Sequence, residues 1–155
     1  MIGRLDVDDI QGNILRPYRF PVAAHLFLRV ADRDAGRRFV GRVAPRVMSA
    51  AEWVGAKPPS AVNVGFTWAG LVAMGVGERV LAAFPVEFRQ GMAARARQLG
   101  DTGGSGPGHW DAGLGTGDAH VLVSVNACSA KVLDATVGGR LTVFEKVDYN
   151  SLFRK

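Results

Sequence analysis

The sequence predicts an α+β domain in which a four-stranded antiparallel sheet is covered by helices on one face. Two observations predict it. Apolar residues recur at every second position in several short stretches, which is typical of half-buried strands. Helical stretches separate these strands in the order strand, helix, strand, twice over. The chain has 155 residues, 48% of them hydrophobic and 21% charged, so we expect one domain over residues 1–155 with a sizeable core.

The first strand-helix-strand unit opens with a strand over residues 22–30, where apolar and other residues alternate. Asp32 or Asp34 is expected to cap a helix that runs to about residue 49. A proline inside this stretch lacks the backbone N–H that a helix needs, so it kinks or shortens the helix. A second strand follows a Pro-Pro-Ser break and covers residues 61–66.

The middle of the chain is predicted to be a helical excursion. Short helices are expected over 68–74 and 78–84, and a proline is well placed to start a helix that runs over 85–99. Residues 100–118 hold eight of the 20 glycines, so we expect a long loop without regular elements. The loop lacks the Lys-Ser/Thr ending of a phosphate loop and does not open a helix.

The second strand-helix-strand unit completes the sheet. A strand is predicted over residues 120–126, a helix over 129–137 that stops at a Gly-Gly pair, and a last strand over 141–147. Two split units of this kind are typical of a ferredoxin-like α+β sandwich. In that fold the first and third strands are antiparallel neighbours.

The positive charge of the chain is interpreted as a solvated helix face. The net charge is +5, and the only tight basic cluster includes Arg38, Arg42 and Arg46, which recur every four residues and therefore share one face of the predicted helix. No zinc-finger pattern, helix-turn-helix signature or aromatic RNA-binding motif accompanies it. We expect no nucleic-acid partner.

Cysteine usage and hydropathy point to an intracellular protein. The single cysteine, Cys128, excludes an internal disulfide framework and a Cys-rich metal site. No apolar run reaches the 18 residues of a membrane span, and the N-terminus lacks the apolar core of a signal peptide. We therefore expect a cytoplasmic protein with no membrane partner.

The face of the sheet opposite the helices is predicted to be neither cleanly polar nor cleanly apolar. Such a face either packs against a second copy of the chain, which gives a dimeric α+β barrel-like arrangement, or lines a pocket for a small hydrophobic ligand. Both hold if the pocket lies between subunits, and we expect a homodimer. The side chains assigned to this face are His25, Phe27, Arg29, Asn63, His120, Leu122, Ser124, Asn126, Thr142 and Phe144.

Three side chains of this face are candidate catalytic residues: His25, His120 and Asn63. An imidazole exchanges protons near neutral pH or ligates heme iron, so His25 and His120, together with Arg29, are also the candidate cofactor-binding residues. The plainer interpretation is that each histidine is a hydrogen-bonded residue of the sheet. No His-x3-His or carboxylate-histidine pair has the spacing of metal ligands, so we expect no metal site.

Several segments, in the same order along residues 8–127, resemble the N-terminal half of dye-decolorising peroxidases. These are heme enzymes with two ferredoxin-like halves in tandem. The resemblance implies the α+β fold that the strand order also predicts. The matching segments are Asp9-Ile10-Gln11-Gly12-Asn13-Ile14-Leu15-Arg16-Pro17-Tyr18, Leu26-Phe27-Leu28-Arg29-Val30, Asn63-Val64-Gly65-Phe66-Thr67-Trp68-Ala69-Gly70-Leu71, Phe84-Pro85-Val86-Glu87-Phe88-Arg89-Gln90-Gly91-Met92, Leu99-Gly100-Asp101, His109-Trp110-Asp111 and His120-Val121-Leu122-Val123-Ser124.

The resemblance does not extend to the family's catalytic residues. In that family the distal Asp lies in a Gly-x-x-Asp-Gly motif after the fourth strand of this half, and the second half supplies the proximal His and the distal Arg. The 155 residues contain neither. None of these roles can be carried over, and His25, His109 and His120 do not match the family's heme ligand. We expect conventional peroxidase turnover to be absent or weak.

Three functions remain open at this point. The first is a stand-alone half-domain that dimerises and binds a hydrophobic small molecule, with heme as the candidate cofactor. The second is a cofactor-free cyclase, isomerase or monooxygenase that acts on an aromatic or polyketide-like metabolite. The third is a non-catalytic partner subunit.

Overall fold

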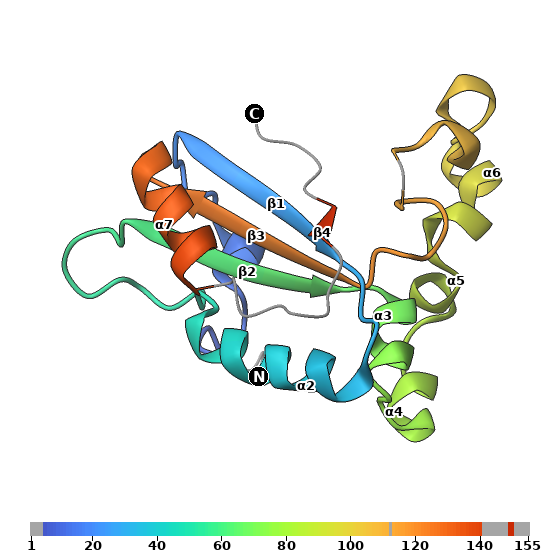
Figure 1. The fold of residues 1–155 in the computed structure, drawn as a ribbon, viewed down its shortest axis with the longest axis horizontal. Coiled ribbons are helices and arrows are strands. Elements are labelled where there is room, and N and C mark those ends of the chain that lie inside the picture. Colours follow the sequence, from blue (N-terminus) through green and yellow to red (C-terminus); the bar gives the residue numbers. More distant parts are fainter. Residues whose placement is uncertain (1–4, 112, 141–148, 151–155) are drawn as a thin grey trace.

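The structure is a computed structural model that describes residues 5–111, 113–140 and 149–150. Its elements are ordered around one sheet, with a helical arm inserted between the second and third strands (Figure 1). In chain order they are α1 (Gly12–Leu15), β1 (Val22–Leu28), α2 (Arg33–Val43), the 3-10 turn η1 (Ala44–Arg46), β2 (Ser60–Phe66), α3 (Trp68–Ala73), α4 (Glu78–Ala82), α5 (Val86–Ala94), α6 (Ala96–Leu99), the 3-10 turns η2 (Gly103–Ser105) and η3 (Pro107–His109), β3 (Val121–Ala127), α7 (Ala130–Arg140) and β4 (Tyr149–Asn150).

The four described strands form one sheet in the order β2-β3-β1-β4, and every neighbouring pair is antiparallel. The first and third strands are neighbours, as the ferredoxin-like prediction requires. The register places Leu26 opposite Val123, and Val64 opposite the same residue from the other side. The strand predicted over 141–147 lies outside the described residues; β4 pairs with β1 through Leu28 and Tyr149.

The core lies between the sheet and two helices on one of its faces. Alternate residues of the three long strands are buried on this side, and Val121, Val123 and Val125 are at most 1% exposed. Phe39 of α2 joins the same buried cluster, and Leu133 of α7 packs against it. The predicted alternation of the strands is therefore confirmed, because side chains at every second position share one face.

Helix α2 begins where the sequence predicts and ends earlier. The Asp32 carboxylate caps its first turn by accepting a hydrogen bond from the Ala35 backbone N–H at 2.7 Å. The helix stops at Val43 instead of near residue 49, and η1 follows, with Pro45 inside it. Because proline has no N–H to donate to the preceding turn, the α-helical ladder cannot continue through it.

Glycines alter two other predicted helices. The helix expected over residues 85–99 is broken, since Gly91 adopts a φ of 72° and the chain leaves helical geometry again at Arg95. Helix α7, expected to stop at Gly138, runs on to Arg140. The glycine-rich loop is also more ordered than expected: η2 and η3 lie within it, and Trp110 Nε1 donates to the Ser105 carbonyl at 2.8 Å.

The helical arm, α3 to α6, projects beyond the ends of the strands (Figure 1). Its aromatic centre consists of Trp68, Phe84 and Phe88, whose ring centroids lie 4.9 to 6.5 Å apart. The arm is joined closely to the sheet, because Thr67 Oγ1 accepts a hydrogen bond from the Gly70 N–H and donates to the Ala119 carbonyl at 2.8 Å. None of the described helices combines the length and the apolar character needed to cross a bilayer.

Strand β2 is an edge strand, and the N-terminal segment covers its edge. The side-chain amide of Gln11 makes two hydrogen bonds with Val64: Nε2 donates to the carbonyl at 2.7 Å, and Oε1 accepts from the N–H at 2.9 Å. The Met48 N–H donates to the Val62 carbonyl at 2.9 Å. These bonds pair backbone groups that an exposed edge would offer to another chain.

Candidate functional site on the open sheet face

The candidate site lies on the face of the sheet that α2 and α7 do not cover, here called the open face. Its members follow from the register, because side chains alternate between the two faces along each strand. The open face consists of Ala23, His25 and Phe27 of β1, Leu122, Ser124 and Asn126 of β3, and Ala61, Asn63 and Gly65 of β2.

Two of the predicted catalytic residues belong to one polar row across this face. His25 lies directly opposite Ser124, and Asn63 lies opposite Ser124 on its other side. Neighbouring strands are about 4.8 Å apart, so His25 and Asn63 are separated by about 10 Å with Ser124 between them. The next row is apolar: Phe27 lies opposite Leu122. His25 is exposed, whereas Phe27, Leu122 and Ser124 are half-buried.

Asn63 is on the open face but is not accessible from it. The residue is 2% exposed because the N-terminal segment folds over β2. Its Nδ2 atom donates to the Met48 carbonyl at 3.4 Å, and its Oδ1 atom has no hydrogen-bond partner among the described residues. A substrate on the open face would therefore meet His25 and Ser124, not the Asn63 amide.

Tyr18 lies beside Asn63, and sequence reasoning did not single it out. It is 7% exposed, and its hydroxyl is also without a hydrogen-bond partner among the described residues. Burial raises the pKa of the Tyr18 phenol, while the nearby Asn63, the backbone at Asn13 and the Arg16 charge oppose the rise. The proton therefore stays on this hydroxyl at neutral pH.

His120 directly precedes the first residue of β3, and its side chain is hydrogen-bonded to the backbone. Its Nδ1 atom accepts a hydrogen bond from the Val30 N–H at 2.9 Å. Burial lowers the pKa of the His120 imidazole, and the Arg29 charge lowers it further, while Asp118 opposes the shift. His120 precedes Ser124 by four positions, or about 13 Å of strand, so the structure does not bring it to His25.

Arg29, the third predicted cofactor-binding residue, lies near His120 at the same end of the sheet. Its Nε atom is 3.5 Å from Asp118 Oδ1, and both side chains are more than half exposed. Such a pair is screened by solvent and contributes little to stability. The predicted residues thus form two groups: His25 with Asn63 at mid-sheet, and His120 with Arg29 at the end of β1.

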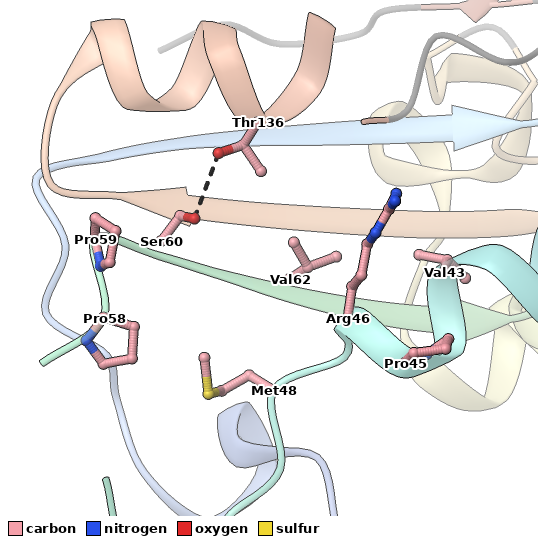
Figure 2. A pocket seen from close by; sticks show the side chains of 9 residues that line it. All are labelled: Val43, Pro45, Arg46, Met48, Pro58, Pro59, Ser60, Val62 and Thr136. Atoms are coloured by element: carbon pink, nitrogen blue, oxygen red, sulfur yellow. Dashed lines mark hydrogen bonds between the residues drawn. The ribbon is translucent and has the colours of Figure 1, made fainter. Parts of the chain in front are cut away.

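The open face alone does not enclose a heme. Its central imidazole, His25, is exposed, and no group of three or more His, Cys, Asp or Glu side chains among the described residues is placed to hold a metal ion. A cavity described on the helix side of the sheet is lined by nine residues, none of them histidine (Figure 2). A heme would fit at His25 only if a second unit covered the open face.

Comparison with known proteins places the chain in a family. The family model described as the DyP dimeric alpha+beta barrel domain matches residues 9–146. The chain belongs to this DyP family. The DyP resemblance expected from the sequence is therefore confirmed, and so is the α+β fold class. No curated protein matches the chain.

Solved structures similar to this DyP domain are DyP-type peroxidases. A decolorizing peroxidase from Auricularia auricula-judae has a TM-score of 0.77 at 20% identity, over 97% of this chain and 34% of the other. A fungal DyP-type peroxidase from the same organism has a TM-score of 0.79 at 21% identity, over 96% and 32%. A dye-decolorizing peroxidase with an engineered heme pocket has a TM-score of 0.78 at 21% identity, over 97% and 32%.

This DyP domain therefore spans about a third of the length of the solved structures that it matches. At these identities the likeness shows the fold.

Proposed function

We propose that this DyP domain is one half of an α+β barrel and that its open face packs against the sheet of a second copy. The observation that carries the proposal is the pairing of Phe27 with Leu122, next to the central His25 row, on a face that no described helix covers. A sheet whose two faces both carry large apolar side chains is stabilised when both are removed from water. The family description, a dimeric barrel, supports the same assembly.

The covered edge of β2 favours association through the face. Gln11 and Met48 already occupy backbone groups of Val62 and Val64 on that edge. A second copy therefore cannot extend the sheet at these positions without breaking those bonds. None of the described helices covers the open face over β1 and β3, where His25 is exposed.

The oligomeric state in solution tests this proposal. Analytical ultracentrifugation of the 155-residue chain is expected to show a dimer, and Leu122→Arg is expected to give a folded monomer because it places a charge in the interface. Val54→Arg is the matched control, since Val54 is fully exposed and lies off the sheet. A monomeric wild type, or Leu122→Arg with the wild-type mass, contradicts the proposal.

The ligand of the assembled barrel is proposed to be a small hydrophobic molecule that lies between the two sheets, with heme as the candidate. His25 is the imidazole that would face this space, and Phe27 and Leu122 would supply apolar contacts. Hemin titration should give a Soret shift with the dimer that is lost in His25→Ala. His109→Ala is the control, because His109 is exposed in the loop.

One observation favours a second function, cofactor-free acid/base catalysis in the same space. His25 lies directly opposite Ser124, so an imidazole and a hydroxyl face a substrate together, next to an apolar row. A dimer that does not shift the hemin spectrum would contradict the heme proposal and favour this function. A monomer would contradict both.

A further inference from the structure

Gly65 is a gap in the apolar row of the open face. The register places Phe27 of β1 opposite Leu122 of β3, and it places Gly65 of β2 opposite Leu122 on the other side. The row therefore runs from a phenyl ring, through a leucine side chain, to a residue with no side chain. Gly65 is exposed, whereas Asn63, the preceding residue of β2 on the same face, is buried. The open face thus carries a projection at one end of this row and a gap at the other.

The fold of a single copy does not require a glycine at this position. The backbone of Gly65 is not in the positive-φ region that favours glycine. Among the described residues, a Cβ atom at Gly65 would meet only the Cβ atom of Leu122, at 3.9 Å, which is an ordinary van der Waals contact. A glycine inside a strand weakens that strand, and it often marks a site where a ligand or another backbone approaches closely. The space over Gly65 is therefore open to a group from outside this copy.

Phe27 is the apolar group that can fill such a gap. It lies two strands from Gly65, about 10 Å away, with Leu122 between them, so it does not fill the gap of its own copy. The Phe27 side chain is half-buried, and none of the ring contacts between described residues involves it. Removing the rest of this ring from water on a second copy is favourable.

A two-fold axis parallel to β3 brings the projection of one copy to the gap of another. β3 lies between β1 and β2 in the sheet. Rotation by 180° about an axis that runs along β3, midway between two stacked sheets, places β1 of each copy over β2 of the other and keeps every residue at the level of its own row. Phe27 of each copy then lies over Gly65 of the other, so the contact forms twice. Side chains of two packed sheets interdigitate across about 10 Å, so a ring on one sheet complements a gap in the other.

We propose that the Phe27 ring of each copy inserts into the gap at Gly65 of a second copy and so sets how the two sheets are aligned. This contact depends on the face-to-face assembly proposed above, and it selects one arrangement. An axis perpendicular to β3 would place β1 over β1 and β2 over β2, so Phe27 could not reach Gly65 of the other copy. A second copy is favoured over a small molecule as the occupant, because one row supplies both the projection and the gap. The adjacent row of His25 and Ser124 is left as the space for a ligand.

Sedimentation equilibrium of the full chain tests the contact through an exchange of side-chain size. Phe27→Ala removes the projection and Gly65→Leu fills the gap, so each is expected to weaken the dimer at least about tenfold. The double variant, Phe27→Ala with Gly65→Leu, places the new leucine side chain against the space that the ring leaves. Because the two positions are in contact across the interface, the double variant should dimerise more tightly than Gly65→Leu alone.

Gly41→Leu is the matched control for the added side chain. Gly41 lies in α2, on the other side of the sheet, and a Cβ atom there would meet nothing within 4 Å among the described residues. Its dimer affinity should equal that of the wild type. Circular dichroism checks that each variant is folded, and Gly65→Ala, whose Cβ atom has room in a single copy, should weaken the dimer in the same direction if Gly65→Leu does not fold.

The outcomes separate this contact from the assembly itself. A dimeric wild type whose affinity is unchanged in Phe27→Ala and in the Gly65 variants overturns the contact and leaves the assembly standing. A double variant weaker than both single variants also overturns the contact, since the two side chains then do not meet. If Gly65→Leu keeps the wild-type dimer affinity but loses the Soret shift with hemin, the gap serves a ligand and the contact is overturned. A monomeric wild type overturns the assembly and the contact together.

Discussion

The Nδ1 atom of His120 accepts a hydrogen bond from the backbone N–H of Val30 at 2.9 Å. Only an unprotonated nitrogen can accept, so the bond requires the neutral imidazole. The backbone of His120 is also bonded, since its N–H donates to Leu28 and its carbonyl accepts from Thr67. One residue therefore connects the end of β1, the start of β3 and the start of α3.

We predict that this bond makes stability depend on pH. Burial and the Arg29 charge lower the pKa of His120 below its ordinary value of 6.5. The unfolded chain thus binds more protons than the folded chain when the pH is below 6.5. The stabilisation is present above that pH and is lost as the pH falls through the folded pKa. Urea unfolding at about pH 7.5 and about pH 5.5 measures the loss.

Two variants test whether His120 is the group responsible for this pH dependence. In His120→Gln the side-chain carbonyl still accepts from Val30 but does not titrate, so the difference between the two pH values should shrink. In His109→Gln an exposed histidine of the loop is removed, and the wild-type difference should remain. An unchanged difference in His120→Gln would show that another group is responsible.

Gly70 is predicted to be intolerant of any side chain. A Cβ atom at this position would lie 2.1 Å from the carbonyl oxygen of His120, which is backbone and cannot rotate away. We expect Gly70→Ala to destabilise the fold by about 3 kcal/mol, because α3 must move off the sheet. Chemical denaturation measures the change.

Gly41 provides the matched control. It lies inside α2, and a Cβ atom there would meet nothing within 4 Å. Gly41→Ala is expected to stabilise the fold by about 0.5–1 kcal/mol, since alanine loses less backbone entropy in a helix. Equal destabilisation by both substitutions would contradict the contact with His120.

The two hydrogen bonds between Gln11 and Val64 are predicted to stabilise the edge of β2. Gln11→Ala should cost about 2 kcal/mol, about 1 for each bond. Gln11→Glu keeps an oxygen that accepts from the Val64 N–H but has no N–H to donate to the Val64 carbonyl. It should therefore lose only the hydrogen bond to that carbonyl. Gln98→Ala, at an exposed position of α6, should change little. If Gln11→Ala unfolds at the same urea concentration as Gln98→Ala, the edge does not depend on this side chain.

The sheet could be predicted from the sequence because its signal is local. Alternation along β1 and β3 separates Leu26 and Val123 from His25 and Ser124 without reference to any other part of the chain. Helix ends were less predictable. Pro45 ended α2 as its chemistry requires, but Gly138 did not end α7, because packing against the sheet outweighs the modest cost of a helical glycine.

For the candidate site, the sequence predicts only which face of the sheet each residue lies on, because side chains alternate between the two faces along a strand. This alternation places His25 and Asn63 on one face, and the register confirms the placement. It does not reveal that Tyr18, 45 positions earlier in the chain, lies beside the buried Asn63, or that the Val30 N–H donates a hydrogen bond to His120. These are long-range contacts, and a single sequence holds no local pattern for them. The cavity of Figure 2 was missed for the same reason, since its prolines were interpreted only as breaks.

The buried hydroxyl of Tyr18 is predicted to be dispensable for stability. It has no hydrogen-bond partner among the described residues, so Tyr18→Phe removes an unsatisfied group and should be neutral or stabilising by about 1 kcal/mol. Tyr18→Ala should instead cost about 3–5 kcal/mol, because the buried ring is lost.

The stability of the wild type is also predicted to fall at high pH. Burial raises the pKa of Tyr18 above 10.0, so the folded chain holds this proton more tightly than the unfolded chain does. Stability is therefore fully present below the unfolded pKa and is lost as the pH rises through the folded pKa. Urea unfolding of both proteins at neutral pH and above pH 10 separates the effects: the wild type should lose more stability than Tyr18→Phe, and equal losses would contradict the raised pKa.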